Sequence, residues 1–413
     1  MRIGIIGAGL GGLLAGASLI KLGHDVTIFE KLSYFGGRFT NFDKKGFGLS
    51  TGALHMIPHA EKGPLGTMLK ELDTGVEIVY CKPEGYYRID GKDYLQSELP
   101  GLFSIKDKAK ILAIVASLKF GAAPDDATFR EWLQKRIDNE LVMQITDSFC
   151  GWGLSINADE ISAREMIAIT TNVNKLRGPG VPVGGCMGVT SALVRKIEEG
   201  GGKIHYKTPI TKIKIEHGKA TGLKTNEGNF DFDIVVSDIG PKETIKLAGP
   251  ENFDQSLVSG IDKINESCGI KMSIACKKPM LGHPGILFTP QAKRIDGINE
   301  VTNADPFLAP EGMHLMMTHQ RLNMGMGAKE EIELGLTDLR ELFPDFDEHC
   351  EVLLVQTFKK GWPVNRSRSG ESVSHQSGVD GLYFVGDGVK PSGWIETEGV
   401  AAGVKLVIDE IEK

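Results

Sequence analysis

The sequence predicts an α/β fold in which a parallel-sheet domain, assembled from separate stretches of the chain, carries an inserted domain of mixed α and β structure. Three observations support this prediction. An apolar run and a glycine-rich turn open the chain, a second strand–turn–helix unit closes it, and a block of mixed helical and strand patterns lies between them. The 413 residues are enough for two or three domains.

The first twelve residues form the strongest motif. They combine an apolar run with three spaced glycines and lead into a helical stretch: residues 3–6, Gly7, Gly9, Gly12 and residues 13–22. Gly7 permits a tight turn, Gly9 lets the backbone approach phosphates, and Gly12 lets the helix pack closely on the strand. Leu10 and Gly11 open that helix, whose N-terminal N–H groups and positive dipole end attract an anion. The motif therefore predicts the pyrophosphate site of a dinucleotide.

An acidic residue follows at the spacing that such a site requires. The second apolar run, residues 26–29, ends on Glu30 and is followed by Lys31. Because Glu30 lies about 20 residues beyond the glycines, its carboxylate can accept hydrogen bonds from ribose hydroxyls.

Two glycines and an arginine come shortly after this second strand. Gly36 and Gly37 permit close backbone approach, and the Arg38 guanidinium can grip phosphate oxygens. The glycine motif alone does not distinguish NAD from FAD, so later segments must decide.

The C-terminal segments favour FAD. A buried strand at 382–385 runs into Gly386 and Asp387, whose carboxylate can accept hydrogen bonds from a polyol such as the ribityl chain of a flavin. A helix then begins with the small and acidic residues Glu398, Gly399 and Val400. Its positive end could stabilise the negative charge of reduced flavin.

Composition sets further bounds. The formal net charge of −7 argues against general nucleic-acid binding. The six scattered cysteines contain no C-x-x-C pair, so neither a disulfide framework nor a zinc knuckle is expected. No stretch resembles a signal peptide or a bilayer span, and we expect a cytoplasmic protein.

These motifs together resemble the FAD-dependent superfamily of phytoene desaturases, carotenoid isomerases and amine oxidases. The resemblance is densest at residues 1–56, 182–240 and 381–408. It implies a discontinuous Rossmann-type FAD-binding domain and an inserted α+β substrate domain, with a mixed β-sheet capped by helices. It also implies that the backbone at Ile210 holds the adenine. We assign residues 1–73, 182–245 and 351–413 to the FAD domain, and 74–181 and 246–350 to the substrate domain.

Catalytic candidates are few, because flavin N5 itself exchanges the hydride and the protein positions the substrate. The resemblance places His55 close to the isoalloxazine. Trp394 precedes the last helix and could line the active site. His55 and His59 are four residues apart, but Pro58 opposes a helix there, so no metal site is expected. No cysteine lies in the final flavin segments, which predicts non-covalent FAD.

The expected function is hydride transfer between flavin N5 and a small apolar substrate of isoprenoid or carotenoid type, by desaturation, saturation or isomerisation. The electron acceptor is open; oxygen and quinones are candidates. A flavin amine oxidase is the first alternative. A prenyl-binding module without redox chemistry, like the Rab escort and GDP-dissociation-inhibitor proteins, is an alternative of another class.

The stretch 108–120, apolar with lysines at both ends, could make peripheral membrane contact, although a buried cap helix is the other interpretation.

Overall fold

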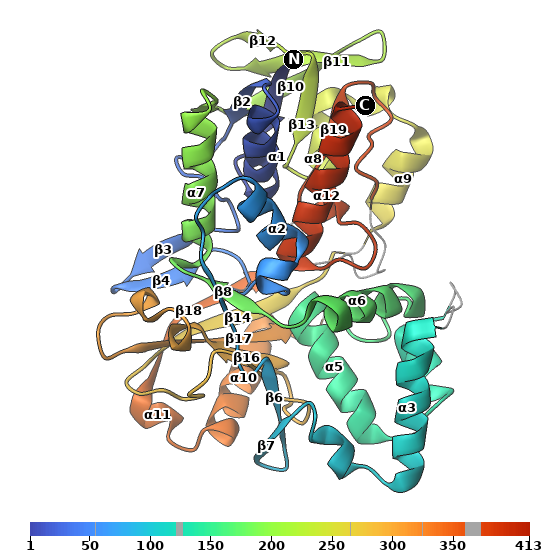
Figure 1. The fold of residues 1–413 in the computed structure, drawn as a ribbon, viewed down its shortest axis with the longest axis vertical. Coiled ribbons are helices and arrows are strands. Elements are labelled where there is room, and N and C mark those ends of the chain that lie inside the picture. Colours follow the sequence, from blue (N-terminus) through green and yellow to red (C-terminus); the bar gives the residue numbers. More distant parts are fainter. Residues whose placement is uncertain (54, 121–126, 265, 324, 360–372) are drawn as a thin grey trace.

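The computed structural model describes residues 1–53, 55–120, 127–264, 266–323, 325–359 and 373–413. Two sheets lie at opposite ends of the molecule, each covered by helices (Figure 1). Both chain termini lie in the end that contains the parallel sheet (Figure 1).

The five-stranded sheet is entirely parallel, as the opening motif predicts. Its strands come from three separate stretches of the chain, in the order β19 (Leu382–Phe384), β13 (Ile234–Ser237), β1 (Arg2–Ile6), β2 (Asp25–Phe29) and β9 (Lys203–His205). β1 lies at its centre, and the last four of its residues are buried. The carboxyl ends of β1, β2, β13 and β19 therefore meet at one edge, where parallel sheets bind ligands.

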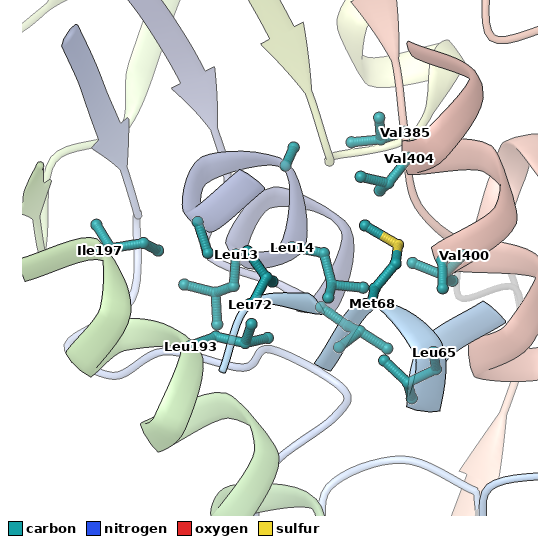
Figure 2. Packing of buried hydrophobic residues seen from close by; sticks show 14 of the residues in the cluster. Leu13, Leu14, Leu65, Met68, Leu72, Leu193, Ile197, Val385, Val400 and Val404 are labelled. Carbon is teal, nitrogen blue, oxygen red and sulfur yellow. The ribbon is translucent and has the colours of Figure 1, made fainter. Parts of the chain in front are cut away.

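Helices cover one face of this sheet around α1 (Leu10–Lys21). α1 packs against α7 (Gly185–Glu199) and α12 (Glu396–Ile411), and α2 (Pro64–Glu71) packs against α12 and joins the same apolar cluster. Figure 2 shows Leu13 and Leu14 of α1 packed among side chains of these helices. The other face packs Ile6 and Phe29 against α8 (Pro241–Ala248), α9 (Gln255–Lys263) and a small sheet of β10 (Ile210–Glu216), β11 (Lys219–Thr225) and β12 (Asn229–Asp231).

The second sheet has seven strands and is mostly antiparallel. Its order is β18 (Cys350–Phe358), β14 (Gly269–Cys276), β17 (His314–Arg321), β16 (Gly297–Glu300), β15 (Ile286–Phe288), β6 (Gly85–Ile89) and β7 (Lys92–Leu95). One face packs against α10 (Ala328–Leu342) and α11 (Phe346–His349). The other, which we call the inner face, packs against α5 (Glu140–Leu154) through Trp152.

Three more helices flank α5, and short strand pairs join the two ends of the molecule. The helices are α3 (Ile105–Phe120), α4 (Phe129–Gln134) and α6 (Ala163–Leu176). The pairs are β3 (Asn41–Lys44) with β4 (Phe47–Ser50), and β5 (Ile78–Tyr80) with β8 (Gly180–Pro182).

Two of the predicted domain boundaries need correction. β18 pairs with β14 over its whole length, so residues 350–358 belong to the seven-stranded sheet and not to the first domain. Conversely, Ala248, Phe253 and Ile261 join the apolar cluster of Ile6, so residues 246–263 pack on the parallel-sheet domain. Both errors arise because the local sequence at a domain boundary does not show which distant strand or helix the segment packs against.

The close packing of α1 on β1 leads to a first prediction. A Cβ at Gly12 would lie 2.1 Å from the Gly7 carbonyl oxygen, so Gly12→Ala should lower the melting temperature and cost about 1–3 kcal/mol. Gly260→Ala is the matched control, because that Cβ has open space inside α9 and should be neutral or slightly stabilising. Thermal melts of both variants test this expectation, and a Gly12→Ala melt equal to wild type would contradict it.

Candidate cofactor and active site

The glycine-rich turn and the Gly36-Gly37 segment lie directly against each other. The Gly36 N–H donates to the Ala8 carbonyl oxygen at 2.7 Å, and Gly9 and Gly36 form an isolated β-bridge. Gly36 has φ +89°, and a Cβ at Gly37 would lie 3.8 Å from the Gly9 Cα. Positions 36 and 37 thus place the following Arg38 close to the N-terminus of α1, and its contact with phosphate stays a prediction.

Glu30 lies at the end of β2, where the sequence places it. Its carboxylate accepts hydrogen bonds from the Ala8 N–H at 2.8 Å and from the Leu32 N–H at 2.7 Å. A carboxylate has about four acceptor sites, so two remain for ribose hydroxyls. Lys31, the next residue, is exposed.

The start of β10 lies beside Glu30. The Thr208 N–H donates to the Glu30 carbonyl oxygen at 2.9 Å, and half-buried Ile210 follows two residues later. This contact is compatible with an adenine site at Ile210, which stays a prediction.

Asp238 is a residue of the site that the sequence argument did not select. It directly follows β13, and its Oδ2 accepts the Gly12 N–H at 2.9 Å. A Cβ at Gly9 would lie 2.4 Å from that oxygen, and a Cβ at Gly386 would lie 2.1 Å from Oδ1. Burial raises the pKa of Asp238 to about 7. The sequence did contain one indication of this role: Asp238 directly follows a buried strand, as Glu30 does.

Arg38 and Asp387 meet across the site. Arg38 Nη1 lies 3.2 Å from Asp387 Oδ2, and the Asp387 carboxylate also pairs with the buried ammonium of Lys390. Lys390, the second residue that the sequence argument missed, lies in the loop before α12. Two cations, Arg38 and Lys390, therefore share the Asp387 carboxylate close to Asp238 at the amino end of α1.

The amino end of α12 begins at Glu396, close to the predicted start of the last helix, and the loop before it contains Lys390. The Gly399 N–H makes the first hydrogen bond of the helix, to the Ile395 carbonyl oxygen, and Val400 is buried in the helical core. A Cβ at Gly399 would lie 2.5 Å from Lys390 Cδ, so this glycine makes room for the lysine stem.

Glu398 turns away from the predicted cofactor position. Its carboxylate accepts the His59 N–H at 3.2 Å and the Leu65 N–H at 2.8 Å, which caps the start of α2. Only its backbone therefore remains for a cofactor, because the side chain is committed to a second helix.

A buried lysine on the inner face of the seven-stranded sheet is the third residue missed from sequence. Lys271 of β14 is fully buried, and its Nζ donates to the Ser50 and Gly52 carbonyl oxygens at 2.8 and 2.6 Å and to Ser50 Oγ at 2.6 Å. Burial lowers the pKa of Lys271 to about 7. A Cβ at Gly52 would lie 2.2 Å from the Arg38 carbonyl oxygen. Lys271 thereby joins the second sheet to the segment beside Arg38.

The two predicted catalytic residues lie in different surroundings. His55 is fully buried; burial and the nearby Lys271 lower its pKa to about 3, so the ring is neutral. Trp394 lies edge-on to His59, with ring centroids 6.2 Å apart, in the loop before α12. The described residues contain no cluster of side chains that could hold a metal ion.

Comparison with known proteins identifies the family. Residues 10–397 match the flavin containing amine oxidoreductases. The chain belongs to this family. An uncharacterised protein of Methanocaldococcus jannaschii, MJ1488, is 43% identical over 411 residues, which cover 100% of this chain and 99% of its own.

Two further relatives bear on structure and chemistry. The crystal structure of an oxidoreductase from Methanosarcina mazei is 41% identical, with a TM-score of 0.93 over 99% of this chain and 100% of its own. The zeta-carotene-forming phytoene desaturase of Myxococcus xanthus is 24% identical over 99% of this chain and 93% of its own. The protein is thus an FAD-dependent oxidoreductase of the amine oxidase and phytoene desaturase superfamily, and the non-enzymatic prenyl-binding alternative is set aside.

The residues present fit FAD. The amino end of α1, where Gly9 and Gly11 leave room for the Asp238 carboxylate, suits the pyrophosphate, with Arg38 nearby. Asp387 follows β19, where the sequence predicts a contact with the ribityl chain, and the first N–H groups of α12 have no partner within the helix. These assignments of single residues to parts of FAD remain predictions.

The buried acids on α12 predict a pH dependence of stability. Burial raises the pKa of Glu398 to about 7 and that of Glu396 to about 8. An acid with a raised pKa in the folded state stabilises the fold at low pH, and this stability is lost as the pH rises from 4.5 through 7. One pKa unit corresponds to about 1.4 kcal/mol, so the contribution of Glu398 alone to the free energy of unfolding falls by up to about 3 kcal/mol over this pH range.

We expect the melting temperature of the apoprotein to fall between pH 5 and pH 8, and to fall less in Glu398→Gln. Exposed Glu216→Gln is the control and should follow wild type. If Glu398→Gln had the same pH slope as wild type, the assignment of this dependence to Glu398 would be wrong.

Proposed function

We propose that this flavoprotein transfers a hydride between flavin N5 and an apolar substrate of isoprenoid or carotenoid type. The observation that carries the proposal is the apolar and aromatic character of the inner face, next to the buried Lys271. Desaturation, saturation and isomerisation all fit this reaction, and oxygen or a quinone would reoxidise the cofactor after a desaturation.

The strand register defines the inner face. Lys271 pairs with His319, which lies opposite Gly297, and this row continues to Phe288 and Tyr87. Directly opposite residues share a face of a sheet. The rings of Phe288 and Tyr87 stack with centroids 4.9 Å apart. Buried apolar side chains continue this face: Ala275, Ile286, Leu315 and Met317.

Lys271 would fix the geometry where the two domains meet. When bound, FAD supplies the hydride chemistry, and the protein must hold the substrate carbon about 3–3.5 Å from the reacting atom. The three oxygens around Lys271 Nζ hold residues 50–52 against β14. Because its pKa lies near neutrality, Nζ can also hold or release a proton at physiological pH.

An amine oxidase is the second candidate, and one observation favours it. Ser273 and Asn299 lie on the inner face, in the next row from Lys271. Neither Ser273 Oγ nor the two amide atoms of Asn299 find a hydrogen-bond partner among the described residues. Buried polar groups without partners are costly, so they point to a polar ligand atom or a buried water.

Substrate turnover tests the proposal and separates the candidates. The purified holoenzyme is mixed anaerobically with phytoene or lycopene isomers in detergent micelles, and flavin absorbance and products are followed. We expect bleaching of the flavin or isomerised product. Lys271→Met should lower kcat at least about tenfold, as loss of a positioning contact does. Lys277→Met is the control: it replaces an exposed lysine and should leave kcat unchanged. Peroxide release with amines and no change in any carotenoid would contradict the proposal and support the amine oxidase.

We also propose that α3 contacts a membrane surface, from which an isoprenoid enzyme would take its substrate. Ile105 and Leu112 are 87% and 70% exposed, and Ala109 and Ala116 are exposed at the same helical spacing. The helix runs along the edge of the molecule (Figure 1). Three lysines near its start, Lys106, Lys108 and Lys110, would face anionic headgroups. No helix among the described residues is long and apolar enough to cross a bilayer.

Leu112→Glu should therefore weaken binding to vesicles that contain anionic lipid, because it places a charge in the apolar stripe. Liposome flotation measures the bound fraction. Phe307→Glu is the control, since Phe307 is 88% exposed but lies on a separate loop. Wild-type protein that stays entirely unbound, or equal binding by the Leu112→Glu variant, would argue against the membrane contact.

A further inference from the structure

We propose that Asp238 binds the pyrophosphate of FAD as a neutral carboxylic acid, so that cofactor binding takes up a proton from solution. The proposal concerns the cofactor site alone and does not depend on the identity of the substrate.

The position of Asp238 carries the argument. Its Oδ2 accepts the Gly12 N–H at 2.9 Å, and this N–H belongs to the first turn of α1. Cβ atoms built at Gly9, Gly11 and Gly386 would lie 2.4, 2.6 and 2.1 Å from its carboxylate oxygens. The carboxyl group therefore lies directly against these glycines, at the amino end of α1 where the pyrophosphate is expected.

The charges around Asp238 oppose a second anion. Glu30 from the end of β2 and Asp387 from the loop after β19 both raise its pKa, whereas Arg38 and the Gly12 N–H lower it. Lys390 pairs with Asp387. The positive groups are two cations and the N-terminus of α1, and three carboxylates already oppose them. The pyrophosphate adds two more negative charges when FAD binds.

Protonation resolves this conflict. A carboxylate repels a phosphate oxygen at contact distance, whereas a carboxylic acid donates its O–H to that oxygen in a charge-assisted hydrogen bond. Burial already raises the pKa of Asp238 to about 7 without FAD, so the proton is available at little cost near neutral pH. The dianion raises this pKa further, since like charges disfavour the ionised form. One proton therefore moves from solvent to Asp238 when FAD binds above pH 7.

Calorimetric titration of the apoprotein with FAD at pH 8 tests the proposal. Titrations in two buffers with different ionisation enthalpies give the number of protons taken up. We expect about one proton for wild type and about none for Asp238→Asn, which keeps the shape without the charge. The Kd for FAD should rise by up to about tenfold per pH unit above pH 8 in wild type and stay flat in Asp238→Asn.

Asp231→Asn is the matched control, because it removes an exposed carboxylate from the same domain; it should show wild-type uptake. Asp238→Ser serves as a second variant if the amide disturbs folding, and it should also show no uptake. No proton uptake by wild type overturns the proposal without any variant, and so does undiminished uptake by Asp238→Asn. Protein that binds no FAD at any pH would instead contradict the flavoprotein assignment.

Discussion

The close contact between the start of α1 and the end of β1 constrains the rest of the site. Because Gly12 packs against the Gly7 carbonyl oxygen, the helix can approach the sheet and direct its N–H groups toward the edge where the parallel strands end. The Gly36-Gly37 segment then pairs with Gly9. Asp238, Arg38 and Asp387 lie near that helix end, and Figure 2 shows the apolar packing that holds α1 in place.

Residues with a strict local requirement were predictable from sequence. The glycine spacing and Glu30 predict a dinucleotide site, because only small residues and an acid at fixed offsets satisfy its geometry. Arg38 was a phosphate candidate because a guanidinium suits phosphate oxygens. Asp238 and Lys390 were missed because their roles depend on which strand ends and loops meet in space. Glu398 was predicted as part of a helix start facing the cofactor, and the sequence pattern did not show that its side chain turns to the Leu65 N–H at the start of α2.

Lys271 illustrates the same limit in the second domain. A lysine within an apolar strand is a visible anomaly, but its three oxygen partners lie about 220 positions earlier in the chain and become neighbours only through the tertiary fold. Its burial requires these partners, since an unpaired ammonium in the core would be prohibitive. The bonds also connect the seven-stranded sheet to the segment that follows Arg38, so one residue links this sheet to the domain of the parallel sheet.

One FAD is expected to extend from the amino end of α1 to the inner face of the seven-stranded sheet. A crystal structure of the protein with FAD would show whether it does. We expect the pyrophosphate beside Gly9, Gly11 and Asp238, and the flavin ring between the amino end of α12 and Lys271. A flavin ring bound away from Lys271, or a pyrophosphate held elsewhere than at the start of α1, would contradict it.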